Sequence, residues 1–264
     1  MKSIELFKNG QLDDALEAAI QSVKKAPTDI NARSAFAELL CFAGDLERAD
    51  KQLDAMARVD PGAAVGVSMF RHLVRAEKAR FEFYSENRVP EFIEQPSEEL
   101  QLRLAAHIAL RAGDNAEAAT KLAEAERLRK AVSGSCNEEP FEDLRDLDDL
   151  LGSVLEVMTS NGKYYWVPFE LITSISFEQV EFTRDLLWRP MEIEVKGDLE
   201  GRVYAPAMYY STSKSEDAKV RVGQATDWDD SHEGMVFGVG QKMLLVGEEA
   251  QPFLQVTDIR INGA

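Results

Sequence analysis

The first 130 residues carry apolar side chains at helical spacing. Neighbours three or four positions apart are apolar in consecutive segments, first Phe36, Leu39, Leu40 and Ala43, then Leu46, Ala49, Leu53 and Met56. This period is that of amphipathic helices, each of which buries one face. The pattern therefore predicts a series of short helices joined by tight turns.

The helices recur as a repeat with a spacing of 34 residues. Gly10, Ala15 and Pro27 correspond to Gly44, Ala49 and Pro61, and the glycine and alanine return at Gly113 and Ala118. Pro96 keeps the phase through an intervening unit without the glycine, which we interpret as a degenerate repeat. The glycine ends one helix in a left-handed turn, the alanine lets two helices approach, and the proline stops the second helix.

This pattern resembles the tetratricopeptide repeat over residues 1 to about 130, although Arg33 stands where the consensus has a large aromatic residue. The resemblance implies stacked helix pairs with a concave face that holds a partner helix or peptide. The groove positions that it implies are Asn31, Ser34, Glu38, Cys41 and Phe42 in one unit, and Leu100, Arg103, His107, Leu110 and Arg111 in another. Alternatively, the helices are a scaffold that docks only the second half of the chain.

A boundary is expected between residues 131 and 151. The stretch AVSGSCNEEP breaks the helical period with Ser, Gly, Asn and Pro and is typical of a linker. The next stretch, FEDLRDLDDLLG, has apolar residues three or four apart and predicts a short amphipathic helix whose acids form a solvated face. We therefore divide the chain into residues 1–130, a linker with an acidic helix at 131–151, and residues 152–264.

From residue 152 the pattern changes to period two, which is typical of strands. Residues 154–158 and 163–167 flank Asn161-Gly162 and predict a β-hairpin with a tight primed turn. Further strands are predicted at 192–195, 202–205, 242–246 and 253–261. No long helical pattern separates them. The fold class is therefore α+β with two domains, helical repeats followed by a small antiparallel sheet or partly open barrel.

Composition narrows the possible partners. Thirty basic against 47 acidic residues give a net charge of −17, which disfavours nucleic-acid binding. The only cysteines are Cys41 and Cys136, which form neither a disulfide framework nor a metal-ligand spacing. No stretch is long and apolar enough to span a bilayer, and the start of the chain lacks an apolar leader. We expect a cytoplasmic protein that binds no membrane.

Candidate catalytic chemistry is sparse. His72, His107 and His232 are scattered, and none has metal-binding spacing. The densest polar cluster is the loop 226–234, with Asp227, Asp229, Asp230, His232 and Glu233, which could hold a divalent cation but is also typical of an exposed loop. Gly238 and Gly240 lack the third glycine of a nucleotide site and are interpreted as a turn. We therefore expect no enzyme, no cofactor and no resident metal.

Four segments of the second half stand out in the sequence, and the first two are not explained by generic strand propensity. They are YYWVPFE at 164–170, DLLWRP at 185–190, TDW at 226–228 and GQKMLLVGE at 240–248. With DLDDLLGSVLEV and the acidic repeat-containing front, they resemble the ImpE/TagJ family of type VI secretion accessory proteins over nearly the whole chain.

The family resemblance implies an adaptor. Family members associate with a helix of the small sheath subunit, TssB, and are thought to influence sheath assembly or its handling by the ClpV unfoldase. The resemblance carries no residue-level motif for the contact, so the groove positions above rest on repeat geometry. Two alternatives stay open: a generic tetratricopeptide chaperone-like or regulatory adaptor, and a metal-dependent hydrolase that uses Asp227, Asp229 and His232.

Overall fold

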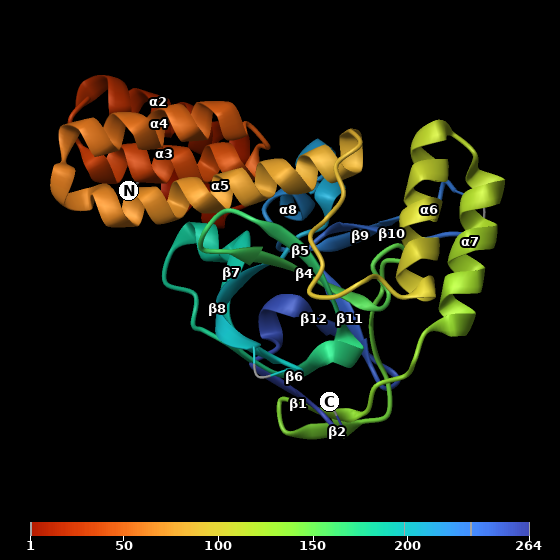
Figure 1. Cartoon of the computed structure of the whole chain (residues 1–264). Helices are drawn as coiled ribbons and strands as arrows, with labels where there is room; N and C mark the ends of the chain where they lie inside the picture. The colour runs from red at the N-terminus through yellow and green to blue at the C-terminus, as the bar shows by residue number, and fades with distance from the viewer. Residues whose placement is uncertain (1, 198, 233, 264) are drawn as a thin grey trace.

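A computed structural model describes residues 2–197, 199–232 and 234–263. The first half is helical, and Figure 1 shows α2 to α5 layered at one end while α6 and α7 stand apart as a pair. The strands lie below and between these two helical groups. The helices are α1 (Lys2–Lys8), α2 (Leu12–Lys25), α3 (Ile30–Phe42), α4 (Leu46–Val59), α5 (Ala64–Ser85), α6 (Glu98–Ala112), α7 (Asn115–Leu128) and the short α8 (Ala218–Arg221).

The repeat signature has the predicted structural roles. The backbone φ angles of Gly10, Gly44 and Gly113 are +79°, +75° and +79°, so each glycine takes the left-handed conformation between two helices. The three repeat alanines, Ala15, Ala49 and Ala118, are fully buried. The helical repeats predicted from glycine and alanine spacing are thereby confirmed.

The intervening unit differs from the degenerate repeat that we predicted. It contains one long helix, α5, and then an extended segment over residues 86–97. Pro90 and Pro96 lie in this segment and disfavour a second helix. Glu91 instead pairs with the edge of the sheet, because its N–H donates to Tyr164 O at 2.9 Å and its carbonyl accepts from Trp166 N at 3.1 Å.

The second half is an antiparallel sheet region and not a closed barrel, in agreement with the predicted class. The large sheet has the order β2-β1-β13-β6-β7-β8-β4-β5, a second sheet has the order β12-β11-β3, and β9 pairs with β10. The strands are β1 (Gly134–Cys136), β2 (Glu139–Phe141), β3 (Leu144–Asp146), β4 (Val154–Thr159), β5 (Tyr164–Pro168), β6 (Ile172–Phe177), β7 (Trp188–Val195), β8 (Leu199–Pro206), β9 (Thr226–Asp229), β10 (Phe237–Gly240), β11 (Met243–Val246), β12 (Glu249–Pro252) and β13 (Asp258–Ile261).

The hairpin of β4 and β5 is confirmed, but its turn is not primed. Only Gly162 has a positive φ, +85°, whereas a type I′ turn needs two such residues. Gly162 N–H donates to Thr159 O at 2.9 Å, which closes a turn before the left-handed glycine. The glycine is needed because a Cβ at this position would lie 3.2 Å from the carbonyl oxygen of His72 on α5.

The predicted acidic helix at 141–151 is wrong. Residues 144–146 form β3, and the segment alternates with period two, burying Leu144, Asp146, Asp148 and Leu150. Because aspartates occupy the two middle positions of this buried series, the apolar residues alone mimic helical spacing. Asp146 and Asp148 are only 2% and 7% exposed, so the prediction of a solvated acidic face also fails. Residues 134–146 belong to the two larger sheets and are not a linker.

The strand predicted at 253–261 is wrong in its first part. The predicted strand 253–261 begins with a 3-10 turn at Phe253–Gln255, and only β13 continues as a strand. β11 pairs instead with β12, which lies in the stretch expected to be a loop. β13 joins the large sheet between β1 and β6.

Candidate functional site

The ten predicted groove positions do not form one open groove. Six of them are buried: Glu38, Cys41, Phe42, Leu100, Arg103 and His107. The second half of the chain contacts two of them, since Arg184 reaches Glu38 at 3.1 Å and Arg103 donates to Asp149 O at 2.6 Å. Phe42 instead packs against Phe7 of α1. Asn31 and Arg111 are exposed, and Ser34 and Leu110 are partly exposed. A binding role for any of the ten stays a prediction.

A buried charge network joins α5 to the sheet. Arg80 donates to both carboxylate oxygens of Glu156 on β4, at 2.7 and 3.0 Å, and to Glu77 at 3.1 Å. Its guanidinium also donates to Met208 O at 2.9 Å. The indole of Trp188 on β7 donates to the second oxygen of Glu77 at 2.9 Å. The helical front and the β half are therefore connected by fully paired charges.

Lys242 extends the network at the other side of Glu156. Its ammonium lies 2.7 Å from Glu156 and 3.6 Å from Asp146, and Lys242 is 1% exposed. Tyr209 donates to Asp146 at 2.8 Å, and Tyr164 donates to Glu156 at 2.6 Å. Burial alone would raise the pKa of Glu156, but the charges of Arg80 and Lys242 outweigh it and lower that pKa to about 2.

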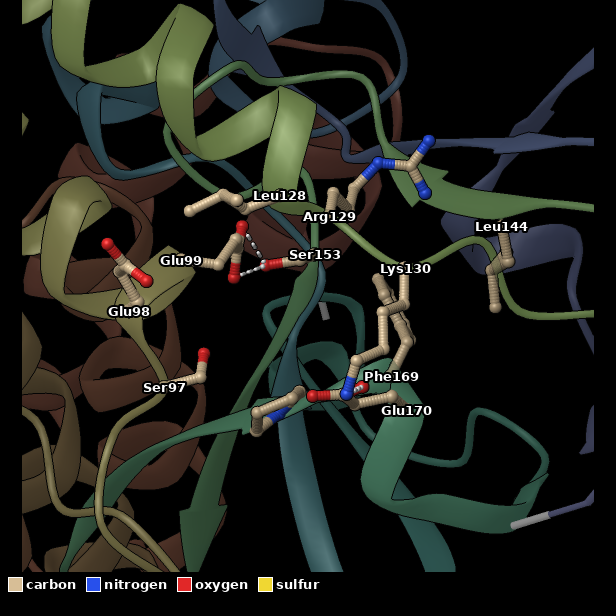
Figure 2. A pocket seen from close by; sticks show the side chains of 11 residues that line it. Ser97, Glu98, Glu99, Leu128, Arg129, Lys130, Leu144, Ser153, Phe169 and Glu170 are labelled. Atoms are coloured by element: carbon tan, nitrogen blue, oxygen red, sulfur yellow. Dashed lines mark hydrogen bonds and ion pairs between the residues drawn. The ribbon is translucent and has the colours of Figure 1, made fainter.

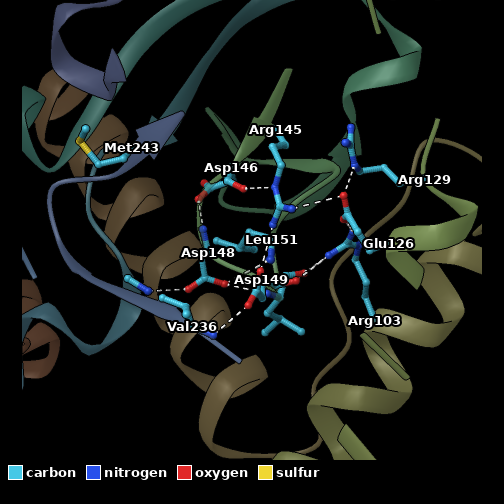
Figure 3. Close-up of polar contacts among 12 residues, drawn as sticks. Arg103, Glu126, Arg129, Arg145, Asp146, Asp148, Asp149, Leu151, Val236 and Met243 are labelled. Atoms are coloured by element: carbon cyan, nitrogen blue, oxygen red, sulfur yellow. Dashed lines mark hydrogen bonds and ion pairs between the residues drawn. The ribbon is translucent and has the colours of Figure 1, made fainter. Parts of the chain in front are cut away.

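The acidic turn after β3 is tied into the same region. Figure 3 shows the side chains of Asp148 and Asp149 directed at backbone and arginine groups of their surroundings. Asp148 accepts from the N–H groups of Leu150 at 2.9 Å and Gly238 at 2.9 Å. Burial, and then the charge of Asp146, raise the pKa of Asp148 to about 7.

The network contains residues from three of the four segments that carry the family resemblance. Tyr164, Trp188 and Lys242 each come from one of them. Sequence analysis missed Glu77 and Arg80, although both lie in helical phase with buried Leu73 and Ala76 on α5. Charged residues on an otherwise apolar helix face were the available signal.

A cleft at the start of α6 is polar, with a volume of about 200 Å³. Figure 2 shows the Ser153 hydroxyl between the two oxygens of Glu99, to which it donates at 2.8 and 2.9 Å. Lys130 pairs with Glu170 at 2.7 Å. These groups are satisfied within the chain, so the cleft offers little to a ligand.

The loop 226–234 does not assemble a metal site in the described part of the chain, where no group of three or more His, Cys, Asp or Glu side chains could hold an ion. Asp229 accepts from Ser231 N–H at 3.0 Å and lies 4.0 Å from His232 Nε2. Asp227 and Asp230 are exposed. Glu233 lies outside the described residues.

Asp229 and His232 instead line a pocket with residues of the predicted groove. This aromatic pocket has a volume of about 240 Å³ and includes His107, Leu110 and Arg111 of α6. Its other lining residues are Tyr84, Asp148, Leu150, Tyr209, Tyr210, Ser211, Phe237 and Gly238. The structure thus brings together two sets of residues that the sequence kept apart.

An apolar cleft opens on the sheet face that is turned away from α5. Its volume is about 360 Å³, and its lining residues are Phe92, Ile93, Val157, Thr159, Tyr165, Val167, Ile193, Val195, Leu199, Glu200, Gly201 and Val203. Leu199 is 53% exposed and Ile93 37% exposed. Sequence analysis did not single out this surface.

A glycine creates the central gap of the apolar cleft. Gly201 on β8 pairs with Ile193 on β7, between the apolar positions Leu199 and Val203 of the same strand face. A Cβ added to Gly201 would meet no atom within 4 Å. The glycine therefore leaves out one side chain in an otherwise continuous apolar surface.

No helix among the described residues combines the length and apolarity that crossing a membrane requires. The fold defines a helical-repeat protein with an antiparallel β half. The family model "ImpE protein" matches residues 138–260, and a tetratricopeptide repeat model matches residues 6–66.

Known proteins resemble nearly the whole chain. The type VI secretion system accessory component TagJ of Pseudomonas aeruginosa is 34% identical over 249 residues, which is 93% of this chain and 86% of that protein. The crystal structure of protein VPA1032 from Vibrio parahaemolyticus covers all of this chain with a TM-score of 0.93 and 31% identity, over 98% of its own length. The chain belongs to the ImpE/TagJ family of type VI secretion accessory proteins, which is not a known enzyme family.

Proposed function

We propose that this protein is a cytoplasmic, non-enzymatic adaptor that binds an amphipathic helix of the small sheath subunit of a type VI secretion system. The family supports an accessory role, and the helical repeats support contact with other proteins. We place the helix in the apolar cleft of the β half. The repeat groove is less suited, because the chain itself fills most of it.

The exposure of Leu199 and Ile93 beside the gap at Gly201 is the observation that carries the proposal. Large apolar side chains at the mouth of a concave apolar surface are typical of protein docking sites. An amphipathic helix would place one anchor in the gap and a second between Ile93 and Tyr165. Each buried anchor contributes roughly 1.5 to 3 kcal/mol before the costs of association, so two anchors give at most about 6 kcal/mol. Micromolar binding, at about 8 kcal/mol, therefore requires further contacts along the helix.

Calorimetric titration with a synthetic N-terminal helix of the cognate small sheath subunit tests the proposal. Leu199→Glu places a charge at the mouth of the cleft and is expected to weaken binding at least tenfold. Val65→Glu is the matched control, because Val65 is an 84% exposed valine at the start of α5, outside the cleft. It should leave affinity unchanged.

Variants of the predicted groove separate the two locations. If Leu110→Glu on α6 abolishes binding and Leu199→Glu does not, the helix binds at the repeats and our placement is wrong. Absence of any binding by the unmodified protein at a few hundred micromolar would refute the sheath-helix proposal. A helix of the same composition in scrambled order should not bind, whereas a generic chaperone-like adaptor would accept both.

The same adaptor would modulate sheath assembly or recycling by the ClpV unfoldase. In our proposal the protein delivers the sheath subunit and does not act on it chemically. Pull-down of purified ClpV by this protein with and without the sheath subunit measures the link. Recovery of ClpV that is equal in both cases would show that the link does not run through the sheath.

A further inference from the structure

The aromatic pocket has one wall made of stacked rings. The rings of Tyr84 on α5 and Tyr210 lie parallel, with centroids 4.4 Å apart and an interplanar angle of 6°. His107 meets Tyr84 edge-on at 5.5 Å. Because Tyr84 comes from the helical front and Tyr210 from the β half, the wall is held from both sides of the molecule.

The polar groups that line the pocket are mainly hydrogen-bond acceptors. His107 Nε2 lies 2.8 Å from Phe83 O, and because a carbonyl only accepts, Nε2 carries the proton. Burial lowers the pKa of His107, so the ring is neutral and its Nδ1 is an acceptor. The carboxylates of Asp148 and Asp229 add further acceptors.

His232 adds an unsatisfied group to the same pocket. Its Nδ1 is enclosed and makes no hydrogen bond within the described residues. The ring of His232 packs edge-on against Phe237 at 5.5 Å, which fixes its position beside Asp229. Enclosed nitrogen atoms without a partner are rare in folded proteins, so a water molecule, an ion or a ligand group is expected at Nδ1.

These features select the charge of a ligand. An anion would meet the carboxylates of Asp148 and Asp229, and an apolar group would leave His232 Nδ1 without a partner. A cation is attracted by the carboxylate of Asp229 and, once it is ionised, by that of Asp148. The rings of Tyr84 and Tyr210 also attract cations, as the chain's own Arg80 and Lys214 show by lying 5.8 and 5.2 Å from their centroids. The guanidinium of Arg111, which donates to Asn87 at 3.1 Å, also lines the pocket, and its charge offsets part of the attraction of the carboxylates.

We propose that the aromatic pocket binds the basic side chain, arginine or lysine, of a segment of a partner protein. A volume of about 240 Å³ is below the range for drug-sized ligands and suits one long side chain. The net charge of −17 favours the approach of basic segments. This site is separate from the apolar cleft, and its occupancy does not depend on the sheath-helix proposal.

Nuclear magnetic resonance titration of the full chain tests the site. The probe is N-acetyl-arginine methylamide, compared with the citrulline analogue, which has the same shape without the charge. The reporter is the backbone amide of Gly238, which donates to Asp148 at 2.9 Å. Saturable shifts with the arginine probe in the millimolar range, and none with the citrulline probe, are expected.

Two variants and a control locate the binding. Asp229→Asn keeps an oxygen that accepts from the Ser231 N–H but removes the negative charge. Tyr210→Leu removes one of the two stacked rings. Each variant should weaken binding of the arginine probe at least threefold. Asp230→Asn changes an exposed acid of the same loop outside the pocket and should have no effect. Equal binding of the two probes, or binding that neither variant weakens, would overturn the proposal.

Discussion

The two faces of the hairpin formed by β4 and β5 have opposite chemistry. The face toward α5 carries Glu156, Tyr164 and Trp166, which are buried in a network of charges and hydrogen bonds. The other face carries Val157 and Val167, which lead into the open apolar cleft. Burying charge is favourable only with complete pairing. The polar face is therefore completed within the chain, whereas the apolar face, on which Val157 and Val167 are each 3% exposed, continues into the cleft where we propose that a partner binds.

Breaking the charge network should have the largest effect on the free energy of unfolding. Arg80→Met leaves the carboxylates of Glu77 and Glu156 buried with one cation fewer, so the free energy of unfolding should fall by about 3 to 5 kcal/mol. Urea denaturation measures this change. Arg58→Met removes a pair with Asp54 that is 79% exposed on the arginine side and should cost less than about 1 kcal/mol. Equal losses in the two variants would show that the network contributes no more than a surface pair.

The buried acids should give opposite pH dependences. Because the pKa of Glu156 is lowered to about 2, its contribution to stability is present above pH 4.5 and is lost as the pH falls toward 2. The pKa of Asp148 is raised to about 7 from 3.8, so this group lowers stability as the pH rises from about 4 to 7.

Thermal melts of Asp148→Asn between pH 5 and 8 measure the second contribution. The wild type should lose more stability over this range than the variant, because only the wild type must ionise a buried acid. Asp230→Asn, an exposed change nearby, should follow the wild type. Parallel curves for all three proteins would contradict the assignment to Asp148.

The smallest expected effect is on the apolar face. Gly201→Val adds a side chain where no atom lies within 4 Å, and removes the flexibility of glycine from a strand. The free energy of unfolding should stay unchanged or rise by up to about 1 kcal/mol. Gly238→Ala is the contrasting change, because its Cβ would lie 2.0 Å from the Tyr209 ring. Marked destabilisation by Gly201→Val would contradict the open space that we describe beside Gly201.

The helical half was more predictable than the β half. Turn glycines and buried alanines act through local geometry, so their spacing alone reports the helix pairs. The segment 141–151 was misassigned because Asp146 and Asp148 take core positions that only distant partners such as Lys242 and Gly238 make tolerable. Long-range pairing of that kind leaves no local signal. The same reason hid both pockets, whose walls come from segments far apart in the sequence.

The position of β13 also determines when the molecule can form during synthesis. β13 lies inside the large sheet between β1 and β6, and Lys242 comes directly before β11. The seven helices of the front are made long before either. A ribosome-bound chain thus contains Arg80 before the Lys242 of the same charge network has been made. β1 and β6 cannot be joined into one sheet until β13 has emerged. Incomplete chains should therefore be easy for proteases to recognise.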